Sequence, residues 1–284
     1  SNEFLLQFLS SQKYFDEVNT CLAGGTRQRI SRSNLANFDV PMPTEKSEQV
    51  AIGSFFTNLD RLITLHQRKY DKLANVKKSM LEKIFPHDGK IVPYIRFSGF
   101  TEDWEQRKLG EVGQVTMGQS PDGSTYSETL SDYILVQGNA DIKDGWVSPR
   151  IWTTQKTKTA DVGDLIMSVR APAGAMGKTS YNVVLGRGVA GIKGNEFIYQ
   201  SLVKMDSDGY WKKLATGSTF EAINSDGVNG AELMVPQDMA EQDRIGEYFA
   251  NLDNLITLHQ CKLKLLKQIK KSMENGLFIK NTTS

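Results

Sequence analysis

The fold is decided by the stretch FFTNLDRLITLHQRKYDKLANVKKSMLEKIF (Phe55–Phe85), which recurs as YFANLDNLITLHQCKLKLLKQIKKSMENGLF (Tyr248–Phe278). The two copies lie 193 residues apart and are identical at 17 of 31 positions. Shorter segments match at the same offset: Asn2–Leu9 with Asn195–Leu202, and GGTRQRI (Gly24–Ile30) with GSTFEAI (Gly217–Ile223). The sequence therefore indicates an internal duplication, in which residues of about 92–194 have no upstream counterpart.

Apolar residues recur every three or four positions in both copies, which is the period of one face of a helix. Helices are expected to begin near Glu45 and Asp238, the second with a capping-box arrangement of Asp238 and Glu241. About 40 helical residues rise about 60 Å, too far for a small domain to cover, so the copies should pair as an antiparallel coiled coil. The residues expected to be buried in the seam are Leu59, Ile63, Leu73, Leu252, Ile256 and Leu266.

Histidine and lysine residues mark the same helices. His66 and His259 occupy equivalent stripe positions, where we expect them to pack in the seam rather than to bind a metal. Between Asp60 and Lys83 there are seven Lys or Arg against three acids. These basic residues form either a solvated helix face or a surface that faces a partner.

The unique region from Trp104 to Pro236 is typical of a mixed α and β domain. Short strands are predicted within 132–142 and 163–169, and an amphipathic helix is predicted at Glu196–Met205. Glycine-bearing turns are frequent between them, which suits a compact sheet whose loops carry recognition. The predicted fold class is α+β: this globular domain plus two long antiparallel coiled-coil helices, internally duplicated.

The repeat also predicts the domain boundaries. The first copy lacks an opening of about 100 residues, so the sequence starts inside the first domain or the natural protein has lost that part. The predicted segments are a remnant of a first domain at 1–43, a long helix at 44–90, a complete second domain at 91–236 and a second long helix at 237–284.

Composition is that of an ordinary globular chain, with 39% hydrophobic residues, 24% charged residues and a net charge of +1. A nucleic-acid binder with this balance must keep its positive charge local. Cys21 and Cys261 are far apart and without metal-ligand spacing, so we expect reduced thiols. The sequence has no long apolar run and no signal pattern, which favours a cytoplasmic protein without membrane association.

Catalytic and cofactor motifs are absent from the sequence. It has no Gly-rich phosphate loop, no Cys/His cluster, no Asn-Pro-Pro-Tyr or Asp-Pro-Pro-Tyr motif and no G-x-S-x-G elbow. The sequence therefore predicts a protein that is not itself an enzyme and that has no cofactor or metal.

The segment GGTRQRISRSNLANFDVPMPTEKSEQVAIGSFFTNLDRLI (Gly24–Ile63) resembles the conserved segment of type I restriction–modification specificity subunits. It repeats at Gly217–Ile256 with Val-Pro-Gln in place of Pro-x-Pro. The segments Trp104–Pro121, Gln137–Gly145 and Gly163–Gly174 resemble parts of a target-recognition domain of that family. Each fragment alone is weak, but their order and duplication are specific, and together they cover nearly the whole chain.

This resemblance implies a DNA-binding subunit with two target-recognition domains, each reading one half of a split site in double-stranded DNA. Two long antiparallel helices would act as a ruler between them. Methyltransferase subunits would dock on this scaffold and use S-adenosylmethionine, and restriction subunits would join for ATP-dependent cleavage. Because the first domain lacks its opening, we expect this chain to read at most one half-site.

Candidate DNA contacts are polar residues in or beside the loops of the unique domain. Arg is suited to guanine, Asn and Gln to adenine, and cationic or amide groups at loop edges to phosphate. For each candidate, an ordinary exposed loop residue is the alternative. The candidates are Arg170, which is the first choice, and Gln119, Ser120, Tyr126, Gln137, Asn139 and Arg187.

Two other functions remain open at this point. The chain could be a fragment of a site-specific methyltransferase or nuclease whose catalytic part lies elsewhere. It could also be a coiled-coil scaffold with a globular cap and no DNA role.

Overall fold

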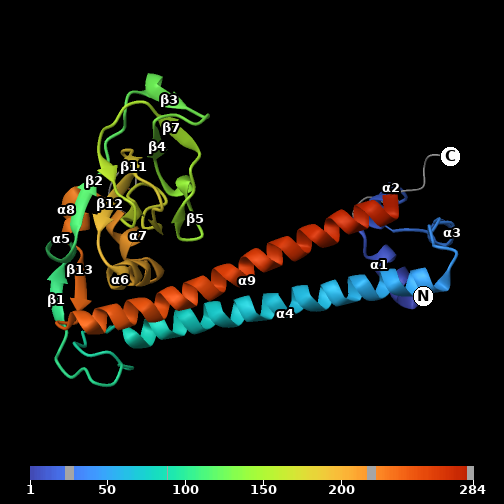
Figure 1. The fold of residues 1–284 in the computed structure, drawn as a ribbon, viewed down its shortest axis with the longest axis horizontal. Helices are drawn as coiled ribbons and strands as arrows, with labels where there is room; N and C mark the ends of the chain where they lie inside the picture. The colour runs from blue at the N-terminus through green and yellow to red at the C-terminus, as the bar shows by residue number, and fades with distance from the viewer. Residues whose placement is uncertain (23–28, 88, 216–221, 280–284) are drawn as a thin grey trace. The chain divides into compact units, whose positions relative to one another are not determined.

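A computed structural model describes residues 1–22, 29–87, 89–215 and 222–279 of the chain, which divides into two compact units. Unit 1 comprises residues 1–74 and 255–284, and unit 2 comprises residues 75–254. Each unit contains part of two long helices, α4 (Lys46–Ile84) and α9 (Met239–Ile279), drawn in cyan and in orange to red in Figure 1. The predicted α+β fold with two long helices is confirmed.

Unit 1 is helical. Its short helices are α1 (Asn2–Leu9), α2 (Gln12–Thr20) and α3 (Arg32–Ala36). The hydroxyls of Ser11 and Ser31 accept hydrogen bonds from backbone N–H groups in the first turns of α2 and α3, as N-cap residues do. The core of this unit joins α1 to α4 through Phe4, Phe8, Phe56 and Leu59, and Leu266 of α9 packs against them.

The long helices are antiparallel in both units, because residue numbers rise along α4 as they fall along α9. The facing pairs are Asp60 with Lys270 and His66 with His259 in unit 1, and Lys77 with Asp253 and Phe85 with Phe249 in unit 2. The predicted antiparallel pairing of the two copies is therefore confirmed.

The six proposed seam residues are all shielded to some extent. Leu59 and Leu252 are buried, whereas Ile63, Leu73, Ile256 and Leu266 are partly buried. Leu59 and Leu266 also take part in the core around α1. Burial does not by itself assign every one of them to the seam, so that assignment stays a prediction.

The capping box predicted at the start of α9 is formed only in part. The Asp238 carboxylate accepts a hydrogen bond from the backbone N–H of Ala240 at 2.8 Å. The Glu241 carboxylate does not turn back to Asp238 but accepts two hydrogen bonds from Arg96, at 2.7 and 2.8 Å. Because the Glu241 side chain is only 1% exposed, a guanidinium that neutralises its charge is favoured over a single backbone N–H.

The described residues of unit 2 form three sheets. The largest has the spatial order β2 (Gln114–Met117), β12 (Val189–Lys193), β9 (Leu165–Ser168), β10 (Met176–Lys178), β6 (Trp146–Val147) and β5 (Ile142–Lys143). The second has the order β3 (Tyr126–Ser127), β7 (Ile151–Thr153), β4 (Tyr133–Val136), β11 (Val183–Leu185) and β8 (Thr159–Ala160). A two-stranded sheet pairs β1 (Glu105–Lys108) with β13 (Glu232–Val235).

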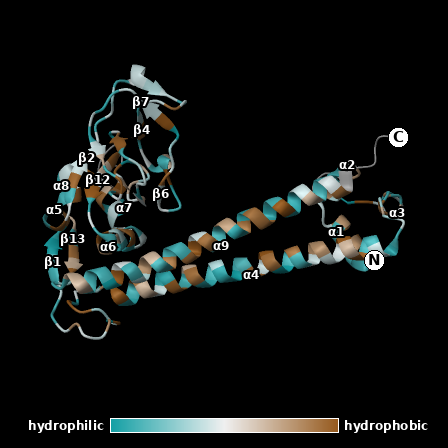
Figure 2. Ribbon diagram, viewed as in Figure 1, coloured by the Kyte–Doolittle hydropathy of each residue, from teal (hydrophilic) through white to brown (hydrophobic). Residues whose placement is uncertain are grey.

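The core of unit 2 lies between the two larger sheets and is built from aliphatic side chains. Val136, Ile166, Leu185 and Val189 are completely buried there. Figure 2 shows the central strands as hydrophobic, whereas α4 and α9 alternate between hydrophilic and hydrophobic turns. The contrast matches strands that are enclosed by the domain and helices that bury one face.

Helices complete unit 2, and α6 fastens it to the long helices. The helices are α5 (Leu109–Val112), α6 (Glu196–Ser207), α7 (Tyr210–Ala215) and α8 (Ser225–Asn229). The ring of Phe197 in α6 lies 5.4 Å from that of Phe85 and 5.6 Å from that of Trp104, centroid to centroid. The expected amphipathic helix thus forms, but most of it is buried because it is enclosed between the long helices and the sheets.

One sequence expectation needs adjustment. The segment 132–142 is a strand at Tyr133–Val136, after which the chain forms a 3-10 helix at Asn139–Asp141 before β5 begins at Ile142. The duplicated segments at Gly24–Ile30 and Gly217–Ile223 lie largely outside the described residues. Among the described helices, none is long and apolar enough to cross a membrane.

The two seam histidines meet each other in unit 1. The Nδ1 atoms of His66 and His259 are 2.9 Å apart and the ring centroids 5.1 Å apart. A neutral pair satisfies this contact, since one Nδ1–H donates and the other Nδ1 accepts. Burial lowers the pKa of His259, and the charges of His66, Lys69 and Lys262 lower it further.

We therefore predict that acid weakens unit 1. Because the folded pKa of His259 lies below its unfolded value, the unfolded chain binds more protons below about pH 6.5, and stability falls as the pH drops through that window. Thermal unfolding followed between about pH 7.5 and pH 5.5 should show a steeper fall of the midpoint for the wild type than for His259→Gln. Equal slopes for wild type and His259→Gln would contradict the prediction.

Candidate nucleic-acid interface

Four loops of unit 2 converge at one end of the two larger sheets. β2 and β9 both end opposite the start of β12, and β4 ends alongside β11, to which it is parallel. The loops that follow β2, β4, β9 and β11 therefore emerge at the same place. We call this the loop edge and define it as residues 118–120, 137–139, 169–172 and 186–188.

Backbone contacts hold the first and last of these loops together. The N–H of Gln119 donates to the carbonyl of Leu185 at 2.8 Å, and the N–H of Arg187 donates to the hydroxyl of Ser120 at 3.1 Å. The Thr157 hydroxyl donates to the carbonyl of Gln119 at 2.7 Å. The Gln119 backbone is thereby fixed from both sides, while its side chain is left exposed.

Glycines allow the loops to approach this closely, and the sequence reasoning missed their role. A Cβ atom on Gly118 would lie 2.0 Å from the carbonyl oxygen of Gly186, and one on Gly188 would lie 2.1 Å from that of Gln137. Both distances are far below any real contact, so only glycine fits. In the sequence, the Gly-Arg-Gly segment between β11 and β12 could have indicated that the loops approach closely here.

The loop after β4 is shaped by Asp141, which is 1% exposed and was also missed. Its carboxylate accepts hydrogen bonds from the N–H groups of Gln137 at 2.7 Å and Gly138 at 3.3 Å. It also accepts one from Nε of Arg150 at 2.8 Å. These hydrogen bonds fix the loop that contains Gln137 and Asn139 and neutralise the Asp141 carboxylate inside it. Gln137 and Asn139 are both partly exposed.

Two exposed arginines belong to the loop edge. Val169, which precedes Arg170, donates its N–H to the carbonyl of Gly188 at 2.9 Å, so Arg170 lies one residue from the loop that carries Arg187. Ser168 fixes the turn after β9 by donating to the carbonyls of Arg170 and Pro172. Within the described part of the chain, neither guanidinium forms an ion pair, so both are available to an anionic partner.

Tyr126 and Lys158 complete the surroundings of the loop edge. The Tyr126 hydroxyl donates to the carbonyl of Pro121 at 3.3 Å and so lies beside the Ser120 loop. Lys158 is exposed, and its carbonyl accepts the N–H of Leu185 at 2.7 Å. Sequence reasoning missed Lys158, because only the β8–β11 pairing brings it to the loop edge. Six of the seven candidates thus lie in four touching loops, and Tyr126 borders them.

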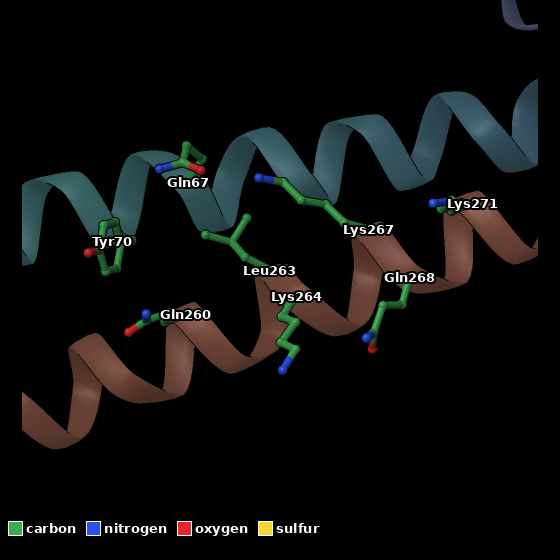
Figure 3. Close-up of a pocket in the computed structure, with 8 residues that line it drawn as sticks. All are labelled: Gln67, Tyr70, Gln260, Leu263, Lys264, Lys267, Gln268 and Lys271. Carbon is green, nitrogen blue, oxygen red and sulfur yellow. The ribbon is translucent and has the colours of Figure 1, made fainter. Parts of the chain in front are cut away.

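A second candidate surface lies on the helix pair of unit 1. A groove of about 510 Å³ between α4 and α9 is lined by apolar, amide and lysine side chains. In Figure 3, Leu263 points from α9 into the space between the helices, Tyr70 points from α4 towards α9, and Lys267 reaches towards α4. Lys264 and Lys271 also line it, and no acid does. The groove can therefore accept an amphipathic, acidic partner.

Elsewhere, the described residues contain no group of three or more His, Cys, Asp or Glu side chains that could hold a metal ion. The chemistry available at the loop edge is hydrogen bonding and cationic attraction.

We predict that Gly118 is indispensable to the loop edge. Gly118→Ala forces the Gly186 carbonyl to move and should destabilise unit 2 by about 1–3 kcal/mol, measured by chemical unfolding. Gly123→Ala is the matched control, because a Cβ there meets no atom within 4 Å. Equal stability of the two variants would mean that the loops do not need this close approach.

Specificity subunits of type I restriction enzymes are among the relatives of this chain. The family model described as type I restriction modification DNA specificity domain matches residues 1–75 and 101–268. The chain is 28% identical over 261 residues to the putative type I restriction enzyme MjaX specificity subunit of Methanocaldococcus jannaschii, covering 87% of this chain and 60% of that protein. It is 21% identical over 272 residues to the MjaVIII specificity subunit of the same organism, covering 87% and 63%. The chain thus spans about three fifths of the length of these curated relatives.

Solved structures share the fold. The HsdS subunit from Thermoanaerobacter tengcongensis matches with a TM-score of 0.55 and 23% identity, over 97% of this chain and 69% of that one. The S subunit of a type I restriction-modification system from M. genitalium matches with a TM-score of 0.67 and 17% identity, over 99% and 73%. Because the family match extends over most of its length, the chain belongs to the type I restriction modification DNA specificity domain family.

Proposed function

We propose that this chain is a sequence-specific DNA-binding subunit that directs the methyltransferase and restriction subunits of a type I restriction–modification complex to a bipartite DNA site. The observation that carries the proposal is the loop edge, where hydrogen-bonding side chains from four loops meet on a rigid sheet scaffold in a member of this family. Loops positioned by a rigid scaffold are the usual place for recognition residues.

The chemistry of the loop edge suits a duplex. Arg170 and Arg187 can each make two parallel hydrogen bonds to a guanine edge, and Gln119, Gln137 and Asn139 can do so with adenine. Ser120 and Tyr126 are suited to contacts with phosphate and sugar, which position a protein without reading sequence. With one described domain of this kind, the chain would read one half of the site.

The helix pair is the proposed docking surface for the modification subunits. Its groove has an apolar floor for packing and three lysines for electrostatic complementarity, the combination that favours a specific protein partner. In this proposal the partner subunits supply methyl transfer and cleavage, and the chain itself carries no cofactor and works in the cytoplasm where the DNA is.

DNA binding gives the decisive test. The wild-type chain should enrich a defined half-site motif from random-sequence duplexes, with an affinity that decreases as salt rises by an amount set by its few phosphate contacts. Arg170→Ala should lose about 1–3 kcal/mol of binding free energy and relax selectivity at one position if it reads a base. A phosphate contact would instead weaken binding to all sequences alike.

The control for this test is an exposed arginine of the same unit, Arg107, which lies on β1 and is paired with Glu111. Arg107→Ala should leave binding unchanged. Unchanged binding by Arg170→Ala would remove this residue from the interface, and failure of the wild type to enrich any motif would overturn the proposed function.

Docking can be tested separately by charge reversal. Lys267→Glu places an acid in the groove and should weaken binding of the methyltransferase subunit by about tenfold or more, because like charges then oppose. Lys262→Glu, on the same helix but outside the groove lining, makes the same change in net charge and should bind as the wild type does. Equal losses in both variants would mean that overall charge, and not the groove, governs association.

A further inference from the structure

We propose that Asp253, Lys77 and Gln200 form a carboxylate seat that fixes the orientation of the recognition domain on the long helices. These are positioning residues for the DNA recognition proposed above, and the inference rests on that function. Lys77 donates to both oxygens of Asp253, at 2.6 and 2.8 Å. Gln200 of α6 donates to the same carboxylate at 2.8 Å. One carboxylate thus joins both long helices to the helix that carries the domain.

Unit 1 contains the same seat, built from the equivalent residues. Lys270 donates to Asp60 at 2.5 Å, and Gln7 of α1 donates to the other oxygen of Asp60 at 3.0 Å. Each of these three residues is related to its counterpart by the repeat offset of 193. The lysines are exchanged between the helices, because each aspartate takes the lysine of the opposite copy. The same arrangement, in which a lysine and a glutamine both donate to one aspartate, is therefore present twice in the chain.

The neighbouring contacts are also built twice. The Gln49 amide donates to the carbonyl of Pro43, and that of Gln242 donates to Pro236. A Cβ on Gly53 would lie 2.7 Å from the backbone nitrogen of Phe4, and one on Gly246 would lie 3.1 Å from that of Phe197. In both units the glycine of the long helix therefore lies against the first turn of the short helix, α1 or α6, with no room for a side chain. The seat lies in an interface whose neighbouring contacts are repeated.

The opposite face of the short helix is not repeated. In unit 2, Ile198 and Tyr199 are 4% and 5% exposed, and Nζ of Lys178 lies 4.6 Å from the Tyr199 ring centroid. Their equivalents in unit 1, Leu5 and Leu6, are 38% and 63% exposed. The residues on this face differ between the copies, with Ile198 and Tyr199 in place of Leu5 and Leu6, whereas the seat residues are identical. Identical seat residues beside different residues on the other face are what a common seat for different recognition domains requires.

The buried glutamine oxygens support a positioning role over a stabilising one. Gln200 Oε1 and Gln7 Oε1 are both buried and have no hydrogen-bond partner among the described residues. An unpaired buried acceptor costs stability. An apolar side chain of similar length would avoid that cost, so the glutamine is explained by the direction that its Nε2–H imposes on the aspartate.

The test is Gln200→Met, which keeps the length of the side chain and removes the unpaired oxygen, the bond to Asp253 and a bond within α6 to Glu196. Spin labels would be attached at Ser180→Cys in the domain and Asn251→Cys on α9, two exposed positions of unit 2, with Cys21 and Cys261 replaced by serine. The wild type should give one narrow distance peak. In Gln200→Met the distribution of distances between the two spin labels should become broad, while the midpoint of thermal unfolding is unchanged or raised. A merely structural role would lower the midpoint instead.

The matched control is Ser201→Ala, which removes a buried hydroxyl from the same helix. The Ser201 hydroxyl bonds only within α6 in the described structure, to the carbonyl of Phe197 at 2.9 Å, so its loss should leave the peak narrow. Asp253→Asn should broaden the peak as Gln200→Met does, with a lowered midpoint because Lys77 loses its counterion. An unchanged distribution in Gln200→Met overturns the seat.

Binding to the enriched half-site duplex separates this inference from the proposed function. Gln200→Met should bind it with wild-type affinity, because the loop edge is untouched, and a large loss of affinity would overturn the role of Gln200 as a seat residue alone. Absence of any enriched duplex for the wild type overturns the proposed function. In that case the distance distributions still decide, by themselves, whether the seat orients the domain.

Discussion

Pairing of a helix with its own duplicate is the constraint on which the rest of this structure depends. An antiparallel pair of copies brings one position against its own equivalent, and here that position is His66 with His259. A permanently charged residue would repel itself at such a point, whereas a neutral imidazole both donates and accepts. Away from that point, the arrangement exchanges partners, so that Asp60 meets Lys270 and Asp253 meets Lys77. The aspartate and lysine of the repeat therefore form an ion pair between the two helices twice, once in each unit.

The long helices were predictable because the forces that form them are local and periodic. An apolar stripe over two matching copies specifies helix, length and partner together, and α4 begins one residue after the expected Glu45. The capping box was predicted from the same local pattern but formed only in part, because Arg96 lies far from Glu241 in sequence. Local patterns cannot anticipate a partner that tertiary structure supplies.

The loop edge could be predicted only as a set of residue types. Gln119, Gln137 and Arg187 were candidates because their side chains can read bases, but their proximity follows from strand order and register. Those depend on long-range pairing that no segment of the sequence contains. The residues that shape the loops were missed for the same reason. Nothing in the sequence distinguishes Asp141 from other acids. Its importance comes from its burial and from the hydrogen bonds that it accepts from backbone N–H groups of the loop.

The near-neutral net charge is compatible with a DNA-binding surface once the partners of each charge are known. The acid closest to the loop edge, Asp141, is neutralised by Arg150 and by backbone N–H groups. Arg170 and Arg187 are exposed without ion pairs in the described structure, so positive charge is presented where the loops meet. A surface with so few cations makes few phosphate contacts and gains little affinity from counterion release. Discrimination between sequences must then come mainly from hydrogen bonds to bases, which depend on orientation far more than charge attraction does. These hydrogen bonds depend on how the loops are held within the domain, whereas the partly buried carboxylate of Asp253, which contacts α6 and α4, bears on how the domain is held on the long helices.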